Sequence, residues 1–174
     1  MEKKLIIFTD IGDTVIDEGT EVRDENAVVV HADCIPGARE TMLELYRRGY
    51  TIVMVADGLV QSFANTMKQH GLSHIFRAKA ISEEVGCEKP GTPMFRAAMD
   101  RTDLTEADKR RIIMVGNNMR KDVTGANRFG LRSVLLAWSP RYSYESETPE
   151  QVPDYTLKKP EELLDLVERL EEKL

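Results

Sequence analysis

The chain has 174 residues and a formal net charge of −6. Hydrophobic residues make up 41% and charged residues 31% of it, which is a globular composition and excludes a disordered chain, a collagen-like repeat and a coiled coil. Because 30 acidic residues outnumber 24 basic ones, the chain is poorly suited to tracking a phosphate backbone, and no nucleic-acid partner is expected.

Short apolar segments alternate with amphipathic segments along the whole chain. The apolar segments predict buried strands, whereas apolar residues at helical spacing, with Gly or Pro near the segment ends, predict helices. In the first part of the chain we expect a strand over Leu5–Thr9, a helix over Pro36–Arg48, a strand over Thr51–Val55, a helix over Val60–His70, a strand over Ala78–Ile81 and a helix over Pro93–Asp100. In the second part we expect a strand over Ile112–Val115, a helix over Lys121–Phe129 and a strand over Ser133–Leu136. A surface loop over Ser139–Pro153, a strand over Tyr155–Leu157 and a helix over Pro160–Lys173 complete the expected order.

This alternation is typical of an α/β fold, in which helices cover both faces of a doubly wound parallel sheet. One segment interrupts the pattern, because the chain between Thr14 and Pro36 is too short for a helical domain. Gly19 and the apolar run Ala27–Val30 favour a β-hairpin there, projecting over the sheet edge as a flap of about residues 15–35.

The length predicts a single domain over residues 1–174. The apolar runs are too short to span a bilayer, and the N-terminal segment lacks the apolar core of a signal peptide. Cys34 and Cys87 have neither a paired-cysteine nor a zinc-binding spacing. We therefore expect no membrane partner and a cytoplasmic location.

Ligands of such sheets bind beyond the carboxyl ends of the strands, so the residues there are the ones to examine for chemistry. They are Thr9, Asp10 and Ile11 after the first strand, Ala56, Asp57 and Gly58 after the second, and Gly116, Asn117 and Asn118 after the strand over Ile112–Val115.

Four motifs occur in order at or near these positions: Asp10 with Gly12, Asp13 and Thr14; Lys89-Pro90; Gly116-Asn117-Asn118; and Asp122. In this order they resemble the haloacid dehalogenase-like (HAD) superfamily of phosphatases, which use an aspartate nucleophile. The resemblance extends over essentially the whole chain. It implies a Rossmannoid α/β fold and a hydrolase that acts on a phosphate ester.

A carboxylate such as that of Asp10 can attack phosphorus and form an aspartyl-phosphate, which divides one difficult step into two. The resemblance implies that Lys89 and Mg²⁺ screen the two anions. The implied metal ligands are Asp10, the backbone carbonyl of Gly12, Asn117 and Asp122, although Asp122 can instead pair with Lys89. The alternative for Asp10 taken singly is a helix or turn cap, and the alternative for Lys89 taken singly is a solvated surface lysine.

Two departures from the family pattern concern proton transfer and the metal. Gly12 stands where the family has the Asp that protonates the leaving alkoxide. The neighbouring Asp13 either replaces that carboxylate as a catalytic residue or points away and caps the following turn. Asn117 stands where the family has a metal-binding Asp, so it keeps an oxygen ligand and loses a charge.

A third departure concerns phosphate binding. Ala56 stands where the family has a Ser or Thr that binds a phosphate oxygen. The backbone N–H groups of Asp57 and Gly58 then become the expected substrate-binding donors, with the Asp57 carboxylate as a source of repulsion.

The segment between Ala56 and Lys89 is filled by a helix, a short strand and loops, so no large cap domain is expected. In the capless relatives the crevice is open, and a macromolecular substrate or a neighbouring subunit can cover it. Arg120 and Lys121 either meet a second anionic group of a substrate or form a solvated helix start. The aromatic residues of the loop after the Ser133–Leu136 strand form a subunit contact, a substrate wall or a packed loop; they are Trp138, Tyr142 and Tyr144.

Two functions fit this sequence. The first is a Mg²⁺-dependent phosphatase of a small phosphate ester, slowed by the changes at Gly12, Ala56 and Asn117. The alternative is a catalytically impaired relative that uses the crevice or another surface for binding. The joint presence of Asp10, Lys89 and Asp122 favours the enzyme.

Overall fold

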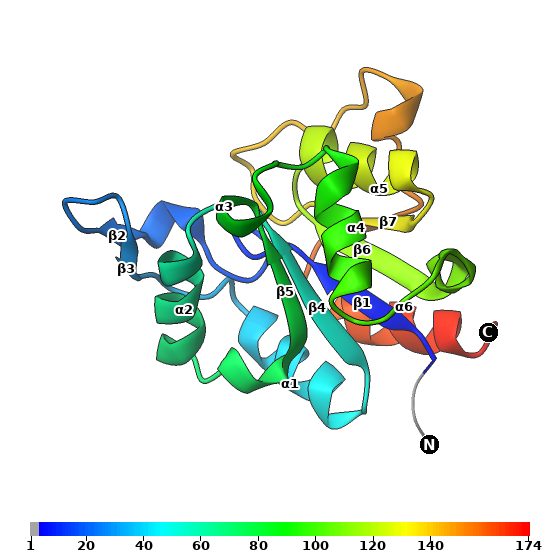
Figure 1. Cartoon of the computed structure of the whole chain (residues 1–174), viewed down its shortest axis with the longest axis horizontal. Coiled ribbons are helices and arrows are strands. Elements are labelled where there is room, and N and C mark those ends of the chain that lie inside the picture. Colours follow the sequence, from blue (N-terminus) through cyan, green and yellow to red (C-terminus); the bar gives the residue numbers. More distant parts are fainter. Residues whose placement is uncertain (1–3) are drawn as a thin grey trace.

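The computed structural model describes residues 4–174. Six strands form one parallel sheet in the order β5-β4-β1-β6-β7-β8 (Figure 1). The strands are β1 (Ile6–Thr9), β4 (Thr51–Ala56), β5 (Phe76–Ile81), β6 (Ile112–Gly116), β7 (Arg132–Leu136) and β8 (Tyr155–Leu157). The predicted strands are confirmed to within two residues, because continuous apolar runs mark strands that are buried on both faces.

Helices follow the strands on both sides of the sheet. The α-helices are α1 (Ala38–Arg47), α2 (Val60–Gln69), α3 (Ser82–Val85), α4 (Thr92–Asp100), α5 (Thr124–Phe129) and α6 (Glu162–Glu171). Short 3₁₀ turns are η1 (Glu18–Thr20), η2 (Ser73–Ile75), η3 (Glu106–Arg111) and η5 (Pro149–Gln151). The helix predicted over Lys121–Phe129 differs, because a π-helical turn, η4 (Met119–Val123), precedes α5.

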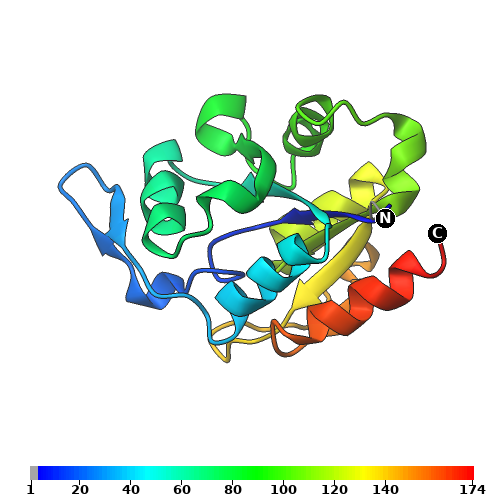
Figure 2. The ribbon, with the colours of Figure 1, turned by 90° about the horizontal axis from the view of Figure 1, so that it is seen from below.

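Each face of the sheet carries its own apolar core, since successive strand residues point to opposite faces. On one face Ile7 of β1 packs in a cluster with Leu45 of α1 and Val167 of α6. On the other face Phe8 packs in a cluster with Phe95 of α4. Figure 2 shows α1 and α6 together on one side of the sheet. The predicted doubly wound α/β fold is thereby confirmed.

The strand order places the carboxyl ends of β4, β1 and β6 side by side at one edge of the sheet. β1 lies between β4 and β6, with Thr9 in register with Met54 and Val115. Along the chain, β4 and β5 are therefore added on one side of β1, and β6, β7 and β8 are then added on its other side. The carboxyl ends of β1, β4 and β6 meet where the order reverses, which is where open α/β sheets bind ligands.

The segment after β1 forms the predicted flap. Strands β2 (Val22–Arg23) and β3 (Val29–His31) make an antiparallel hairpin that lies beside α2 in Figures 1 and 2. Ala27 lies in its turn with φ of 62°, rather than in a strand. No insertion of domain size interrupts the described chain, so the expected absence of a large cap is confirmed. Within residues 4–174, no helix has the length and hydropathy that crossing a bilayer requires.

Candidate active site

Asp10 follows β1 at the carboxyl edge of the sheet. Its backbone N–H donates to the carbonyl of Val115 at 2.9 Å, which fixes the loop to β6. Its carboxylate accepts a hydrogen bond from Lys89 Nζ at 2.9 Å through Oδ1 and a longer one from the Thr14 hydroxyl at 3.3 Å through Oδ2. The side chain is 13% exposed, so one buried ammonium orients a carboxylate that still reaches solvent.

Lys89 is buried at the centre of the site. Its Nζ donates to Asp10 Oδ1 at 2.9 Å, to Asp122 Oδ1 at 2.7 Å and to the carbonyl of Val55 at 2.8 Å. Burial lowers the pKa of Lys89, but Asp10 and Asp122 outweigh that effect and hold the pKa above its usual value. Lys89 is therefore a permanent cation with all three protons engaged.

Asp122 is placed by the π-helical turn η4. Its backbone N–H donates to the carbonyl of Asn118 at 2.8 Å, and its Oδ2 accepts from the Asn118 N–H at 3.0 Å. The carboxylate occupies the space where a Cβ on residue 116 would stand, which explains the glycine at that position. Burial and the nearby Asp10 raise the pKa of Asp122, whereas Lys89 opposes the rise. One lysine thus balances two buried carboxylates.

The loop after β4 brings Asp57 into the same network. Asp57 Oδ1 accepts from the Lys89 backbone N–H at 3.0 Å, and Oδ2 lies 3.3 Å from Lys121 Nζ. Ala56 is fully buried, and the N–H of Gly58 donates to the Ser82 hydroxyl at 2.8 Å. Lys121 also lies 3.2 Å from the Glu88 carboxylate, so it compensates the negative charge of Asp57 only in part.

Asp13 is 1% exposed, and its carboxylate is fully engaged. Oδ1 accepts from Arg141 Nη2 at 2.7 Å and from the Glu18 backbone N–H at 3.0 Å, and Oδ2 accepts from the Tyr142 hydroxyl. The indole N–H of Trp138 donates to the Asp13 carbonyl at 2.7 Å. Two of the three loop aromatics noted in the sequence thus pack on the nucleophile loop.

Glu18 is the site residue that the sequence did not reveal. Its carboxyl group lies against Gly12, in the place that a Cβ on residue 12 would occupy. Partial burial, together with the negative charges of Asp13 and Asp10, raises the pKa of Glu18 from 4.5 to about 7, although Arg23 opposes the rise. The one available signal was the glycine at position 12, where a side chain is expected.

These residues line one crevice of about 170 Å³, which contains Asp10, Gly12, Asp13, Glu18, Asp57, Lys89, Asn117, Asn118, Lys121, Asp122 and Tyr142. Five carboxylates and only two lysine ammonium groups face it. The structure therefore brings together Asp10, Asp57, Asn117 and Asn118 from the three strand ends. Ala56 and Gly58, expected at the substrate, do not line this crevice. Arg120 lies outside the crevice, where it forms an exposed ion pair with Glu147 at 2.9 Å.

The donor set of the crevice suits a hard cation. Among residues 4–174, no group of three or more His, Cys, Asp or Glu side chains forms a ready-made metal site. Asp10, Gly12, Asn117 and Asp122 nevertheless all line the crevice and carry oxygen atoms, which are the ligands that Mg²⁺ prefers. Asp122 also makes the alternative pairing with Lys89, and both of its oxygens already accept hydrogen bonds. The excess of carboxylates over ammonium groups also favours a divalent cation there.

Comparison with known proteins identifies relatives. A family model for haloacid dehalogenase-like hydrolases matches residues 9–136. Glyceraldehyde 3-phosphate phosphatase of Methanopyrus kandleri is 31% identical over 140 residues, which cover 80% of this chain and 57% of that protein. Phosphoserine phosphatase of Thermus thermophilus is 34% identical over 119 residues, 68% of this chain and 45% of that protein. The chain spans about half the length of these curated relatives.

Solved structures support the fold. A HAD phosphatase from Thermococcus onnurineus superposes with a TM-score of 0.75 at 17% identity, over 94% of this chain and 97% of that one. A dehalogenase with an intermediate complex superposes with a TM-score of 0.77 at 13% identity, over 95% and 98% of the two chains.

Proposed function

The chain belongs to the haloacid dehalogenase-like hydrolases, and we propose that it is a Mg²⁺-dependent phosphatase of a small phosphate monoester. The observation that carries the proposal is the contact between Asp10 and the buried Lys89 at the carboxyl edge of the sheet. The names of the relatives support the reaction class, since they include phosphatases of phosphorylated small molecules.

Asp10 is the proposed nucleophile. An oxygen of its carboxylate attacks phosphorus, the bond between phosphorus and the ester oxygen breaks, and the alcohol departs. Water then attacks the aspartyl-phosphate, which releases inorganic phosphate and restores the carboxylate. Lys89 holds one carboxylate oxygen in place and lowers the repulsion between the carboxylate and the phosphoryl group.

A divalent cation would be held by Asp10, the Gly12 carbonyl, Asn117 and Asp122. When bound, Mg²⁺ would screen the negative charge of the phosphoryl group. The phosphoryl group would otherwise enter a crevice with five carboxylates. Substrate binding is proposed at the Ala56–Gly58 loop through the backbone N–H of Asp57, because the Gly58 N–H donates to Ser82; Lys121, 3.3 Å from the Asp57 carboxylate, is a neighbouring cation.

Within residues 4–174, the site lacks an evident group that would donate a proton to the leaving group. Residue 12 has no side chain, and both oxygens of Asp13 accept hydrogen bonds within the fold. Of the two roles expected for Asp13, the geometry supports capping the following turn, because Oδ1 accepts from the Glu18 N–H; the same carboxylate also binds Arg141 and Tyr142. Because general acid catalysis is worth about 10²–10⁴ in rate, activated esters should turn over faster than alkyl esters.

The proposed setting is the cytoplasm, and both Cys34 and Cys87 are unpaired in the structure. A second copy of the chain over the open crevice remains a prediction.

Turnover of p-nitrophenyl phosphate with Mg²⁺ tests the proposal. We expect activity in the wild type, loss of activity in Asp10→Asn, and unchanged activity in Asp165→Asn, which alters an exposed carboxylate of α6. Absence of activity in the wild type, together with binding of phosphate esters without turnover, would instead support the impaired relative. Activity that survives in Asp10→Asn would exclude the aspartyl-phosphate.

A further inference from the structure

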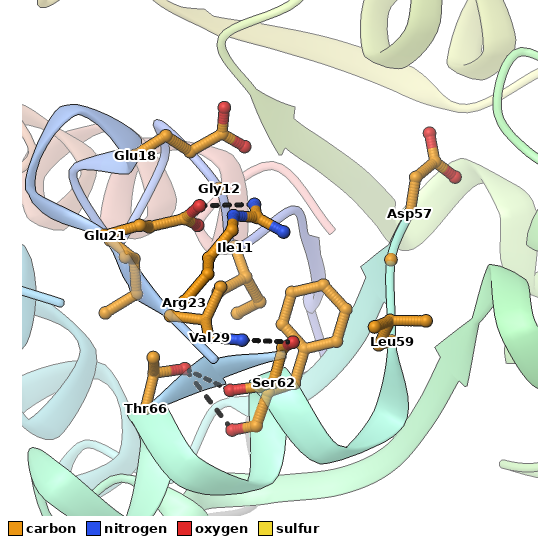
Figure 3. A pocket seen from close by; sticks show the side chains of 13 residues that line it. Ile11, Gly12, Glu18, Glu21, Arg23, Val29, Asp57, Leu59, Ser62 and Thr66 are labelled. Carbon is orange, nitrogen blue, oxygen red and sulfur yellow. Dashed lines mark hydrogen bonds and ion pairs between the residues drawn. The ribbon is translucent and has the colours of Figure 1, made fainter. Parts of the chain in front are cut away.

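A second pocket, of about 100 Å³, lies between the flap and α2 (Figure 3). It shares Gly12, Glu18 and Asp57 with the crevice, so the two hollows adjoin each other. Its apolar lining consists of Ile11, Ile16, Val29, Leu59 and Phe63. A phosphoryl group beside Asp10 would therefore have this pocket next to it.

The walls of the pocket are fixed rather than loosely apposed. The Val29 N–H donates to the buried Ser62 hydroxyl at 2.9 Å, and Asn65 Nδ2 donates to the Val29 carbonyl at 2.9 Å. One turn further along α2, the side-chain oxygen of Gln69 accepts from the Ala32 N–H at 3.1 Å. These bonds join the flap to α2 and preform the pocket, as is usual for small-molecule sites.

The charges around the pocket are unequal. The Arg23 guanidinium is bonded to Glu21 and to the carbonyl of Ala27 at 2.9 Å, so its positive charge is already compensated. Asp57 is paired with Lys121. Among residues 4–174, no cationic side chain forms an ion pair with the Glu18 carboxylate, which lines both the pocket and the crevice, although Arg23 is near enough to lower its pKa.

We propose that this pocket receives the leaving group of the phosphate ester and that Glu18 selects a leaving group with an ammonium group near the ester oxygen. The predicted substrate class is thus an amino-alcohol phosphate monoester; the inference rests on the proposed phosphatase function. A carboxylate or a second phosphate in the same place would meet Glu18, Glu21 and Asp57 with one compensated guanidinium to oppose them.

The chemistry of the leaving group agrees with this assignment. An ammonium group withdraws electrons and makes the departing alkoxide a weaker base, which is an advantage where residue 12 supplies no acid. In the reaction, the bond between Asp10 and phosphorus forms, the bond to the ester oxygen breaks, and the amino alcohol takes its proton from water.

Three esters of similar size separate charge from shape: phosphoethanolamine, n-propyl phosphate and phosphoglycolate. In the wild type we expect kcat/KM for phosphoethanolamine to exceed that for n-propyl phosphate about tenfold, with phosphoglycolate the poorest. Glu18→Gln should remove this preference, because it removes the charge that the ammonium group is proposed to contact. Glu25→Gln, a change of an exposed carboxylate on the same flap, should preserve the preference.

A binding measurement separates the inference from the proposed function. Calorimetry on Asp10→Asn should give tighter binding of phosphoethanolamine than of n-propyl phosphate, and Glu18→Gln in that background should abolish the difference. Equal kcat/KM and equal affinity for the two esters, or a preference that persists in Glu18→Gln, would overturn the inference. If p-nitrophenyl phosphate is not hydrolysed but the binding difference is present, the phosphatase proposal fails and the pocket assignment stands.

Discussion

At the scale of single residues, Lys89 compensates two carboxylates that the fold buries with it. Both Lys89 and Asp122 have side chains that are 2% exposed, and Asp10 is 13% exposed. Lys89→Met would leave these carboxylates facing each other without a cation. Removing one partner of a buried ion pair costs about 3–5 kcal/mol, and we expect a loss of that size in the free energy of unfolding measured in urea.

Lys68→Met provides the matched control, because Lys68 is an exposed lysine of α2. That variant should stay within about 0.5 kcal/mol of the wild type. Adding Asp122→Asn to Lys89→Met should recover part of the loss, since it removes one of the uncompensated charges. Equal stability of the two single lysine variants would show that Lys89 is not the compensating charge.

Glu18 makes a prediction about pH, because burial, Asp13 and Asp10 raise its pKa from 4.5 to about 7. Between these values the folded chain keeps a proton that the unfolded chain has released, so the Glu18 contribution to stability falls as the pH rises. Glu18→Gln cannot ionise and should gain stability relative to the wild type between about pH 5 and about pH 8.

Chemical denaturation at the two pH values measures this difference, and Glu25→Gln is again the control. If the free energy of unfolding of Glu18→Gln differed from that of the wild type by the same amount at both pH values, the raised pKa of Glu18 would be contradicted.

The residues of the site were predictable from the sequence to different degrees. Asp10 and Asn117 follow strands, and parallel strands bring their carboxyl ends to one edge, so pattern alone placed them together. Arg141 and Tyr142 reach Asp13 from a loop more than a hundred positions later. No local sequence pattern encodes such a long-range contact. Glu18 could not be predicted either, because the 3₁₀ turn η1 is what positions it in the crevice.

At the scale of elements, the helix after β6 shows what periodicity cannot reveal. The Asn118 side chain accepts from the N–H groups of Arg120 and Lys121, and the Asn118 carbonyl accepts from the Val123 N–H at 3.3 Å. This spacing widens the first turn into a π-helix, which places Asp122 against Lys89. Residues 118–122, which are polar except for Met119, are equally typical of an ordinary helix start, so the sequence predicted a helix but not its widened turn.

The contact between α4 and α5 depends on Gly125. A Cβ at this position would lie 2.6 Å from Phe95 Cε2 and 3.2 Å from Pro90 Cα. Gly125→Ala should therefore lower the free energy of unfolding by about 1–3 kcal/mol through overpacking. The loss is expected although alanine favours a helix by about 1 kcal/mol over glycine.

Thermal and urea unfolding would measure this effect. Phe95→Leu in the Gly125→Ala background should recover part of the stability by opening space for the new methyl group. A Gly125→Ala variant more stable than the wild type would show that helix propensity outweighs the contact.

At the scale of the whole molecule, the fold collects negative charge at one edge of an already acidic chain. The net charge is −6, and five carboxylates line the crevice where the strand order reverses. The overall α/β architecture followed from the alternation of buried strands and helices, because short connections leave few ways to arrange them. The accumulation of negative charge in the crevice could not be predicted from that alternation, since it depends on side chains from the flap and from distant loops.

This accumulation predicts that a divalent cation stabilises the whole fold. A ligand at 100 times its Kd stabilises by about 2.7 kcal/mol, so saturating MgCl₂ should raise the Tm by several degrees. NaCl at the same ionic strength should have a smaller effect, because it screens charge without binding at the site. Differential scanning calorimetry of the wild type in both salts makes the comparison.

Two variants decide whether the cation binds in the crevice. Asn117→Asp adds a carboxylate among the proposed ligands and should increase the Mg²⁺-induced rise in Tm, whereas Asp10→Asn should reduce it. An equal rise in the wild type and both variants would show that Mg²⁺ acts on the charge of the molecule as a whole. If the Mg²⁺-induced rise in Tm instead increases with the negative charge at residues 10 and 117, the cation that the proposed reaction requires binds in the crevice and stabilises the fold from there.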